Sequence, residues 1–181
     1  LVHPWFRNQG IGKKLWYLRR DLLLNRLKEN ATIGMDGVAA MQPFYEKGGF
    51  QVAFKDERYE CNGQQLSYSQ NILKIELEDF DEINNYDLEC FGFDRTTFLK
   101  SWLTLPNRYA FKYVDHNELK GFAVIRKVCI GYKIGPLFAD NDAVAEEFYR
   151  ACLNSAIDEP VYFDIPAINK GAVSLVKKYK A

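Results

Sequence analysis

Apolar residues recur along this chain at two spacings, one typical of helices and one typical of strands. Apolar side chains at every third or fourth position, with charged residues between them, predict an amphipathic helix over residues 11–28. The same spacing, preceded by the capping residues Asp140 and Asn141, predicts another over residues 143–156. Shorter helices are predicted over residues 38–47, within 79–105 and over 169–179. Alternating or β-branched runs predict strands over residues 31–35, 51–54, 58–61, 72–77, 109–114, 119–126, 129–134 and 161–165.

The order of these elements predicts an α/β protein with a mixed sheet. The helix over residues 11–28 stands between an apparent strand end and the strand over residues 31–35, an order that implies a parallel, right-handed crossover. Residues 63–71 are polar and lack periodicity, so we place a domain boundary there. The predicted domains cover residues 1–68 and 69–181.

Composition excludes some classes of partner. The chain has 24 acidic and 24 basic residues, and this balance gives no electrostatic reason to expect nucleic acid or a membrane as a partner. No apolar run is long enough to span a bilayer, and no leader pattern is seen. A cytoplasmic or nuclear location is therefore expected.

The cysteines and histidines do not have the spacing of a metal site. No C-x-x-C pair occurs, and neither histidine stands near a cysteine at ligand spacing. We expect no bound metal, and free, buried thiols in a reducing compartment, at Cys61, Cys90, Cys129 and Cys152.

Residues His3–Gly12 join a strand end to a glycine-rich turn and the first helix. Glycines at positions 10 and 12 let an anion approach the backbone, where the free N–H groups of the helix start point at it. The predicted ligand is a phosphate or pyrophosphate, although neither a P-loop nor a Rossmann pattern is complete. The alternative is that these glycines only permit a tight turn.

Two motifs resemble one known family. The sequence Arg7-x-x-Gly10-x-Gly12 resembles the acyl-CoA signature of the GNAT N-acetyltransferases, and Phe44-Tyr45-x-x-x-Gly49-Phe50 looks like the end of their domain. The resemblance implies a GNAT-type fold and acetyl-CoA as co-substrate. It implies that Tyr45 is the general acid, because a phenol is protonated at neutral pH; the alternative is a core tyrosine. The residues implied to bind acetyl-CoA are Leu1, Val2, Arg7, Asn8, Gln9, Gly10, Ile11, Gly12 and Lys13.

The second half of the chain resembles the degenerate C-terminal domain of a tandem GNAT subfamily. The resemblance lies in Gly121-Phe122, Arg126, residues 134–139 and Asp164-x-Pro166. No phosphate loop is seen there, and an aspartate at the start of the helix repels a pyrophosphate. The resemblance also implies that the N-terminal half of the first domain is missing from this chain.

The general base and the acceptor are not identified by this resemblance. Asp36 and His3 are candidates for the base only by their position, and each has a structural alternative, as a helix cap and as a satisfied strand-end residue. In the tandem subfamily the second domain is expected to form the acceptor side. The residues that could contact the acceptor, or could instead form internal ion pairs, are Asp94, Arg95, Arg126 and Asp164.

The reaction implied is direct transfer of an acetyl group from acetyl-CoA to a primary amine in a ternary complex. The amine belongs to a small molecule or a peptide, and a second copy of the chain is a candidate partner. Two alternatives stay open. One is a non-catalytic module that binds acyl-CoA or another protein, and the other is a site for a different anion.

Overall fold

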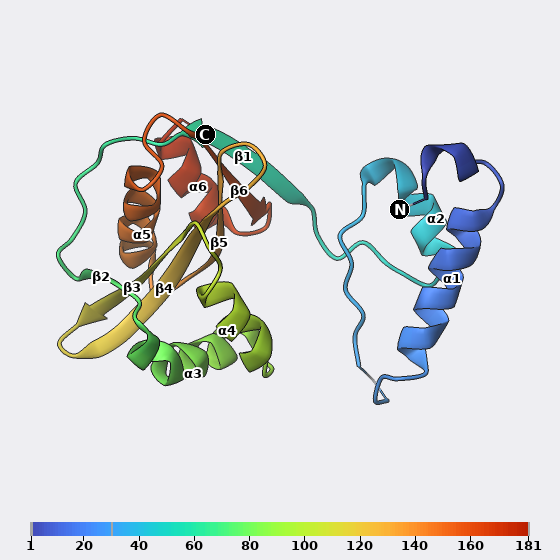
Figure 1. Ribbon diagram of the computed structural model, residues 1–181, viewed down its shortest axis with the longest axis horizontal. Coiled ribbons are helices and arrows are strands. Elements are labelled where there is room, and N and C mark those ends of the chain that lie inside the picture. Colours follow the sequence, from blue (N-terminus) through green and yellow to red (C-terminus); the bar gives the residue numbers. More distant parts are fainter. Residues whose placement is uncertain (1, 30, 181) are drawn as a thin grey trace. The chain divides into compact units, whose positions relative to one another are not determined.

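A computed structural model describes residues 2–29 and 31–180 of the chain (Figure 1). Their contacts divide the chain into two compact units, which we call unit 1, Leu1–Ala53, and unit 2, Phe54–Ala181. Each unit is described by itself below.

Unit 1 consists of one long helix and a short helical segment. It contains the 3-10 helix η1, Pro4–Phe6, the helix α1, Ile11–Leu24, and the pair η2, Ala39–Met41, and α2, Gln42–Glu46. The prediction of a helix from residue 11 is confirmed, although α1 ends four residues earlier than expected. Pro43 lies in the first turn of α2, where its missing N–H has no helical partner to lose.

Two strands predicted in unit 1 are not formed. Residues 31–35 and 51–54 have no regular secondary structure. A strand is stable only when a neighbour completes its backbone hydrogen bonds, and the described part of unit 1 contains no strand to pair with either segment. β-branched residues such as Thr32 and Ile33 favour an extended chain but do not supply that neighbour.

Unit 2 is built on a six-stranded mixed sheet with strand order β1-β6-β5-β4-β3-β2. Neighbouring strands are antiparallel except for β5 and β6, which are parallel. This agrees with the predicted α/β class and mixed sheet. The strands are β1, Asp56–Asn62, β2, Ile72–Lys74, β3, Arg108–Asp115, β4, Glu118–Lys127, β5, Tyr132–Ala139, and β6, Pro160–Pro166.

Strand β1 lies at one edge of this sheet. It was expected to end the first domain, but it pairs antiparallel with β6, from Asp56 opposite Pro166 to Asn62 opposite Pro160. Asp56 and Glu57, expected in a turn, belong to the strand. The boundary between residues 68 and 69 stays a prediction, and the polar segment 63–71 contains no strand up to Asn71.

Helices cover both faces of the sheet (Figure 1). One face carries α5, Asp142–Asn154, and α6, Lys170–Lys178, and the other carries α3, Phe80–Phe91, and α4, Thr96–Leu103. The region 79–105 thus forms two helices, because Gly92 adopts a left-handed backbone with φ of 87° and ends α3. The predicted strand over 72–77 stops at Lys74, and Leu77 begins the short η3, Leu77–Asp79.

Strand β5 is longer than predicted and pairs with β4 from end to end. It continues through Gly135 and Pro136 to Ala139 along β4, whereas only Tyr132–Ile134 pair with β6. Strand β6 therefore separates from β5 after Phe163. Residues 135–139 are part of the sheet, whereas the strand predicted in this region ended at residue 134.

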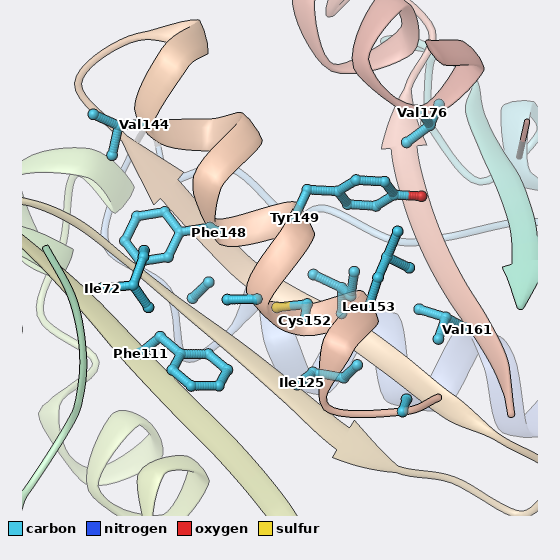
Figure 2. Packing of buried hydrophobic residues seen from close by; sticks show 14 of the residues in the cluster. Ile72, Phe111, Ile125, Val144, Phe148, Tyr149, Cys152, Leu153, Val161 and Val176 are labelled. Carbon is cyan, nitrogen blue, oxygen red and sulfur yellow. The ribbon is translucent and has the colours of Figure 1, made fainter. Parts of the chain in front are cut away.

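The larger hydrophobic core lies between the sheet and α5 with α6. Figure 2 shows Phe148 of α5 beside Ile72 and Phe111, and Leu153 on the other side of the helix, near Val161 of β6. The spacing of the buried residues on α5 repeats every three or four positions, as the sequence predicted. A second core lies under α3 and α4 and includes Ile83, Leu99, Phe122 and Val124.

The four cysteines are free, but they are not all buried. Cys152 is fully buried in the larger core, and burial raises the pKa of its thiol. Cys61 is half-buried, and Cys90 and Cys129 are exposed, which corrects the expectation of four buried thiols.

The variant Phe148→Ala removes a ring whose exposed fraction is 0%. It should lower the free energy of unfolding of unit 2 by about 3–5 kcal/mol. The matched control is Phe93→Ala, because Phe93 is 65% exposed and its removal should change stability by less than about 0.5 kcal/mol. Urea denaturation followed by circular dichroism measures both. Equal losses for the two variants would contradict the described core.

Candidate functional site

The turn that precedes α1 has the backbone geometry of an anion site. Gly10 is the N-cap of α1 and has a left-handed backbone with φ of 76°, and no side chain forms a hydrogen bond at this cap. The first turn of α1 contains no acidic residue. The N–H groups of Ile11, Gly12 and Lys13 are therefore left for a ligand, with the positive end of the helix dipole behind them.

The glycines of the turn leave open space. A Cβ atom added at Gly10 would meet no described atom within 4 Å, and one added at Gly12 would meet only Val2 Cγ2, at 3.5 Å. The packing of the described residues does not itself require a glycine at position 12. Free space at this position is what a phosphate close to the backbone needs.

Several of the predicted ligand-binding side chains hold the turn in shape. The Arg7 Nε donates to the carbonyl of Val2 at 3.1 Å, and the Gln9 amide donates to the carbonyl of Trp5 at 3.4 Å. Asn8 has a left-handed backbone with φ of 62°, which asparagine tolerates better than most residues. Lys13 is exposed, and Leu1 lies outside the described residues.

Tyr45 lies on α2, and α2 packs on α1 through Trp16. The Tyr45 ring is half-buried, and its ring centroid lies 5.9 Å from that of Trp16. Its edge fills the position that a side chain at Gly37 would occupy, since a Cβ there would lie 2.8 Å from Tyr45 Cε2. Within residues 2–29 and 31–180 the Tyr45 hydroxyl forms no hydrogen bond, so it is available as a donor.

Trp16 is a residue that our sequence analysis missed. Its ring lies 5.0 Å from that of Phe44, and a Cβ at Gly48 would lie 1.9 Å from it. Arg20, one turn further along α1, donates to the Gly48 carbonyl at 3.2 Å. The sequence contained a signal for Trp16: it follows Gly12 by four residues and so lies on the same face of α1 as the end of the glycine turn.

Neither candidate for the general base is supported by its surroundings. His3 is exposed and accepts a hydrogen bond from the backbone N–H of Trp5 at 3.5 Å, as the N-cap of η1. Asp36 is exposed, and the N-caps of η2 and α2 are Val38 and Met41, so its expected capping role is wrong.

The corresponding helix start in unit 2 is arranged in the opposite way. Asn141 Oδ1 accepts a hydrogen bond from Val144 N at 3.0 Å, and Asp142 follows in the first turn of α5. The side-chain cap uses a donor that is left free in α1, and the carboxylate disfavours a second anion. This geometry supports the prediction that unit 2 does not hold a pyrophosphate here.

A comparison with protein families matches residues 83–181 to the acetyltransferase (GNAT) domain family. The chain belongs to the GNAT family. The matched residues run from α3 to the end of the chain and therefore lie within unit 2, beyond the anion turn. The GNAT family is also the one that the two N-terminal motifs, outside the matched residues, resemble.

Relatives of this GNAT chain are longer than the chain itself. The holothin acyltransferase of Pseudoalteromonas sp. (strain SANK 73390) is 28% identical over 180 residues, which are 98% of this chain and 60% of that protein. The crystal structure of a proposed acetyltransferase from Pyrococcus horikoshii is 26% identical with a TM-score of 0.75, and the match covers 99% of this chain and 58% of that one. The chain thus spans about three fifths of the length of these relatives.

A tandem GNAT protein from the clavulanic acid biosynthesis pathway has a similar fold. Its TM-score is 0.59 at 13% identity, and the match covers 98% of this chain and 69% of that chain.

Among the described residues of this GNAT chain, no helix is both long and apolar enough to cross a membrane. In the same part of the chain, no group of three or more acidic, histidine or cysteine side chains could hold a metal ion.

Three of the four candidate acceptor contacts have partners within unit 2. Arg95 forms a two-fold hydrogen-bonded ion pair with Asp87, at 2.7 and 2.6 Å, and Asp87 is only 1% exposed. Asp94 lies just before α4 and accepts hydrogen bonds from the hydroxyl and from the backbone N–H of Thr96, and this bonding lowers the pKa of its carboxyl.

Asp164 is the acceptor of a larger ion-pair network on the sheet. It accepts two hydrogen bonds from Arg58, at 2.7 and 2.8 Å, and one from Lys133 at 2.5 Å. Hydrogen bonds and charge from Arg58, and then from Lys133, lower the pKa of Asp164 to about 2. The fourth candidate, Arg126, has no carboxylate partner among the described residues.

Replacing Asp164 by Asn should destabilise unit 2 in a pH-dependent way. The lowered pKa means that the carboxylate stabilises the folded state above its unfolded pKa of about 3.9, and that this contribution is lost as the pH falls toward about 2. The difference in thermal midpoint between wild type and Asp164→Asn should therefore be largest near neutral pH and shrink between pH 4 and 2. Glu89→Gln, which removes an exposed carboxylate on α3, serves as the control, and a pH-independent difference would contradict the ion pair.

Proposed function

We propose that this chain carries the acetyl-CoA site of an N-acetyltransferase that transfers an acetyl group to a primary amine by direct attack in a ternary complex. The observation that supports it best is the uncapped start of α1, preceded by a left-handed Gly10 and open space. In this proposal, the free N–H groups bind the pyrophosphate. Hydrogen bonds to a charged acceptor such as this are stronger than hydrogen bonds between neutral groups.

The binding residues act mainly through the backbone in this proposal. Gly10, Ile11, Gly12 and Lys13 present N–H groups to the pyrophosphate, while Arg7, Asn8 and Gln9 hold the turn that positions them. Leu1 and Val2 would pair with the pantetheine arm as an additional strand. A backbone N–H of that region would stabilise the oxyanion of the tetrahedral intermediate.

Tyr45 is proposed as the general acid. Attack of the amine nitrogen on the thioester carbon forms the C–N bond, and breaking of the C–S bond leaves a thiolate on CoA. The Tyr45 hydroxyl, which has no partner among the described residues, donates its proton to that sulfur. The acylated nitrogen loses its extra proton to solvent water, and the Tyr45 phenolate regains a proton from solvent. The contact between Tyr45 and Trp16 supports this role, because Trp16 stands one turn after Gly12 on the helix that begins at the anion turn.

We also propose that the protein is of the tandem type, with unit 2 as a degenerate GNAT-like domain. The capped start of α5 supports this, since it replaces the phosphate loop by Asn141 and Asp142. The likeness to the fold of a tandem GNAT protein agrees with it. In this arrangement, the N-terminal half of the catalytic domain lies outside the chain. We further propose that the partners are amine acceptors and that the location is cytoplasmic.

Replacing Gly10 by Asp should weaken acetyl-CoA binding by at least about tenfold, since it places a carboxylate where the pyrophosphate binds and a charged hydrogen bond contributes about 1.5–3 kcal/mol. Isothermal titration with acetyl-CoA measures the change. Gly49→Asp is the matched control, because Gly49 also has a left-handed backbone, with φ of 92°, and open space in unit 1, so it adds the same charge and the same backbone strain elsewhere. Unchanged affinity in Gly10→Asp would show that this turn is not the binding site.

Replacing Tyr45 by Phe should lower kcat by roughly 10²–10⁴-fold with little change in the KM for acetyl-CoA, because the variant loses only the proton donor. CoA release with a panel of primary amines measures this in the full-length protein. Tyr17→Phe removes another half-buried hydroxyl of unit 1 and should stay active. Binding without turnover in the wild type would favour the non-catalytic alternative instead.

A further inference from the structure

Three basic residues stand side by side across the sheet of unit 2. Arg108 on β3 lies directly opposite Arg126 on β4, and Arg126 lies directly opposite Lys133 on β5. Residues in such positions share one face of the sheet, with Cβ atoms about 4.5–5.5 Å apart. Like charges at this separation destabilise a sheet, so their presence in a row requires a source of negative charge.

Protein carboxylates neutralise this row only in part. Lys133 pairs with Asp164, but Asp164 is already held by Arg58 through two hydrogen bonds. Arg108 donates to the backbone carbonyl of Leu103, which carries no charge. Arg126 has no carboxylate within ion-pair distance in the part of the chain that the structure describes.

Arg126 is nevertheless held in place by an aromatic platform. Its guanidinium carbon lies 4.7 Å from the ring centroid of Trp102. Trp102 is fixed in turn, because its indole N–H donates to the Gly135 carbonyl at 2.9 Å and its ring stacks on Phe98 with centroids 5.0 Å apart. A guanidinium stacked in this way keeps its N–H groups in one plane, as a preorganised fork.

A cavity of about 330 Å³ adjoins Lys133. Its lining combines apolar groups with the charged end of the row. The lining residues are Arg58, Val128, Cys129, Ile130, Lys133 and Tyr162. Tyr162 stands opposite both Lys133 and Glu60, and the further carboxylates on this face among the described residues are Asp56 and Glu60, which alternate with Arg58 along β1. Four cations against three carboxylates leave this part of the sheet with a net positive charge.

We propose that Arg126 and Lys133 form a binding site for a small organic carboxylate whose apolar body enters this cavity. The site consists only of residues of unit 2 and is separate in composition from the acetyl-CoA turn. A planar carboxylate matches the guanidinium fork of Arg126, and Lys133 supplies a second donor from the next strand. The apolar side chains Val128 and Ile130 contact the remainder of the ligand.

The probe is benzoate, titrated into the full chain at constant ionic strength. Two-dimensional ¹⁵N–¹H spectra follow the indole N–H of Trp102 and the backbone amides of Arg126 and Lys133. Saturable shifts of these signals are expected, with benzyl alcohol, which lacks the charge, binding at least tenfold more weakly. Inorganic phosphate separates the contribution of charge from the contribution of apolar contact, because it carries charge but no apolar body. Shifts that rise linearly, or benzyl alcohol and benzoate binding equally, would overturn the proposal.

Arg126→Gln should weaken benzoate binding at least tenfold. Lys177→Gln removes the same charge from an exposed position on α6 and should leave benzoate binding unchanged. Arg126→Lys keeps the charge and loses the fork, so an intermediate affinity is expected. The same spectra report whether each variant is folded. Equal weakening by Lys177→Gln would show that only the net charge matters and would refute a defined site.

Discussion

The need of every strand for a hydrogen-bonded neighbour governs the structure of this chain. In unit 2 it is met by six strands in one sheet, and β1 joins that sheet by pairing with the outer edge of β6 along Pro160–Pro166. In unit 1 the segments 31–35 and 51–54 have suitable residues but no described neighbour, and they stay irregular. The same local pattern thus has two outcomes, decided by what lies beside it.

The two helix starts of this family member show how few atoms separate an anion site from a closed cap. At α1 the cap is Gly10, with no side chain to accept from the helix N–H groups. At α5 the Asn141 amide oxygen takes the Val144 N–H at 3.0 Å, and Asp142 adds negative charge. The dipole has the same sense at both helices, so the two starts differ in the side chain at the cap, which occupies one helix N–H at α5 and none at α1.

Charged residues on the sheet of unit 2 differ in how completely they are paired. Arg95 and Asp164, both considered as acceptor contacts, have intramolecular partners at 2.5 to 2.8 Å. Arg126 instead stacks on Trp102, and its row of neighbours is basic. Sequence spacing could not separate these cases, because the partners Asp87, Arg58 and Trp102 come from other elements of the fold.

Local pattern alone determined the helices α1, α5 and α6, most strands of unit 2 and the glycine turn before α1. These depend on periodicity, caps and glycine geometry, which act over a few residues. Tertiary structure decided the place of β1 beside β6, the extension of β5 through Pro136 and the role of Trp16 between α1 and α2. Those features depend on contacts between residues far apart in the chain, and no local pattern of hydrophobic and polar positions contains them.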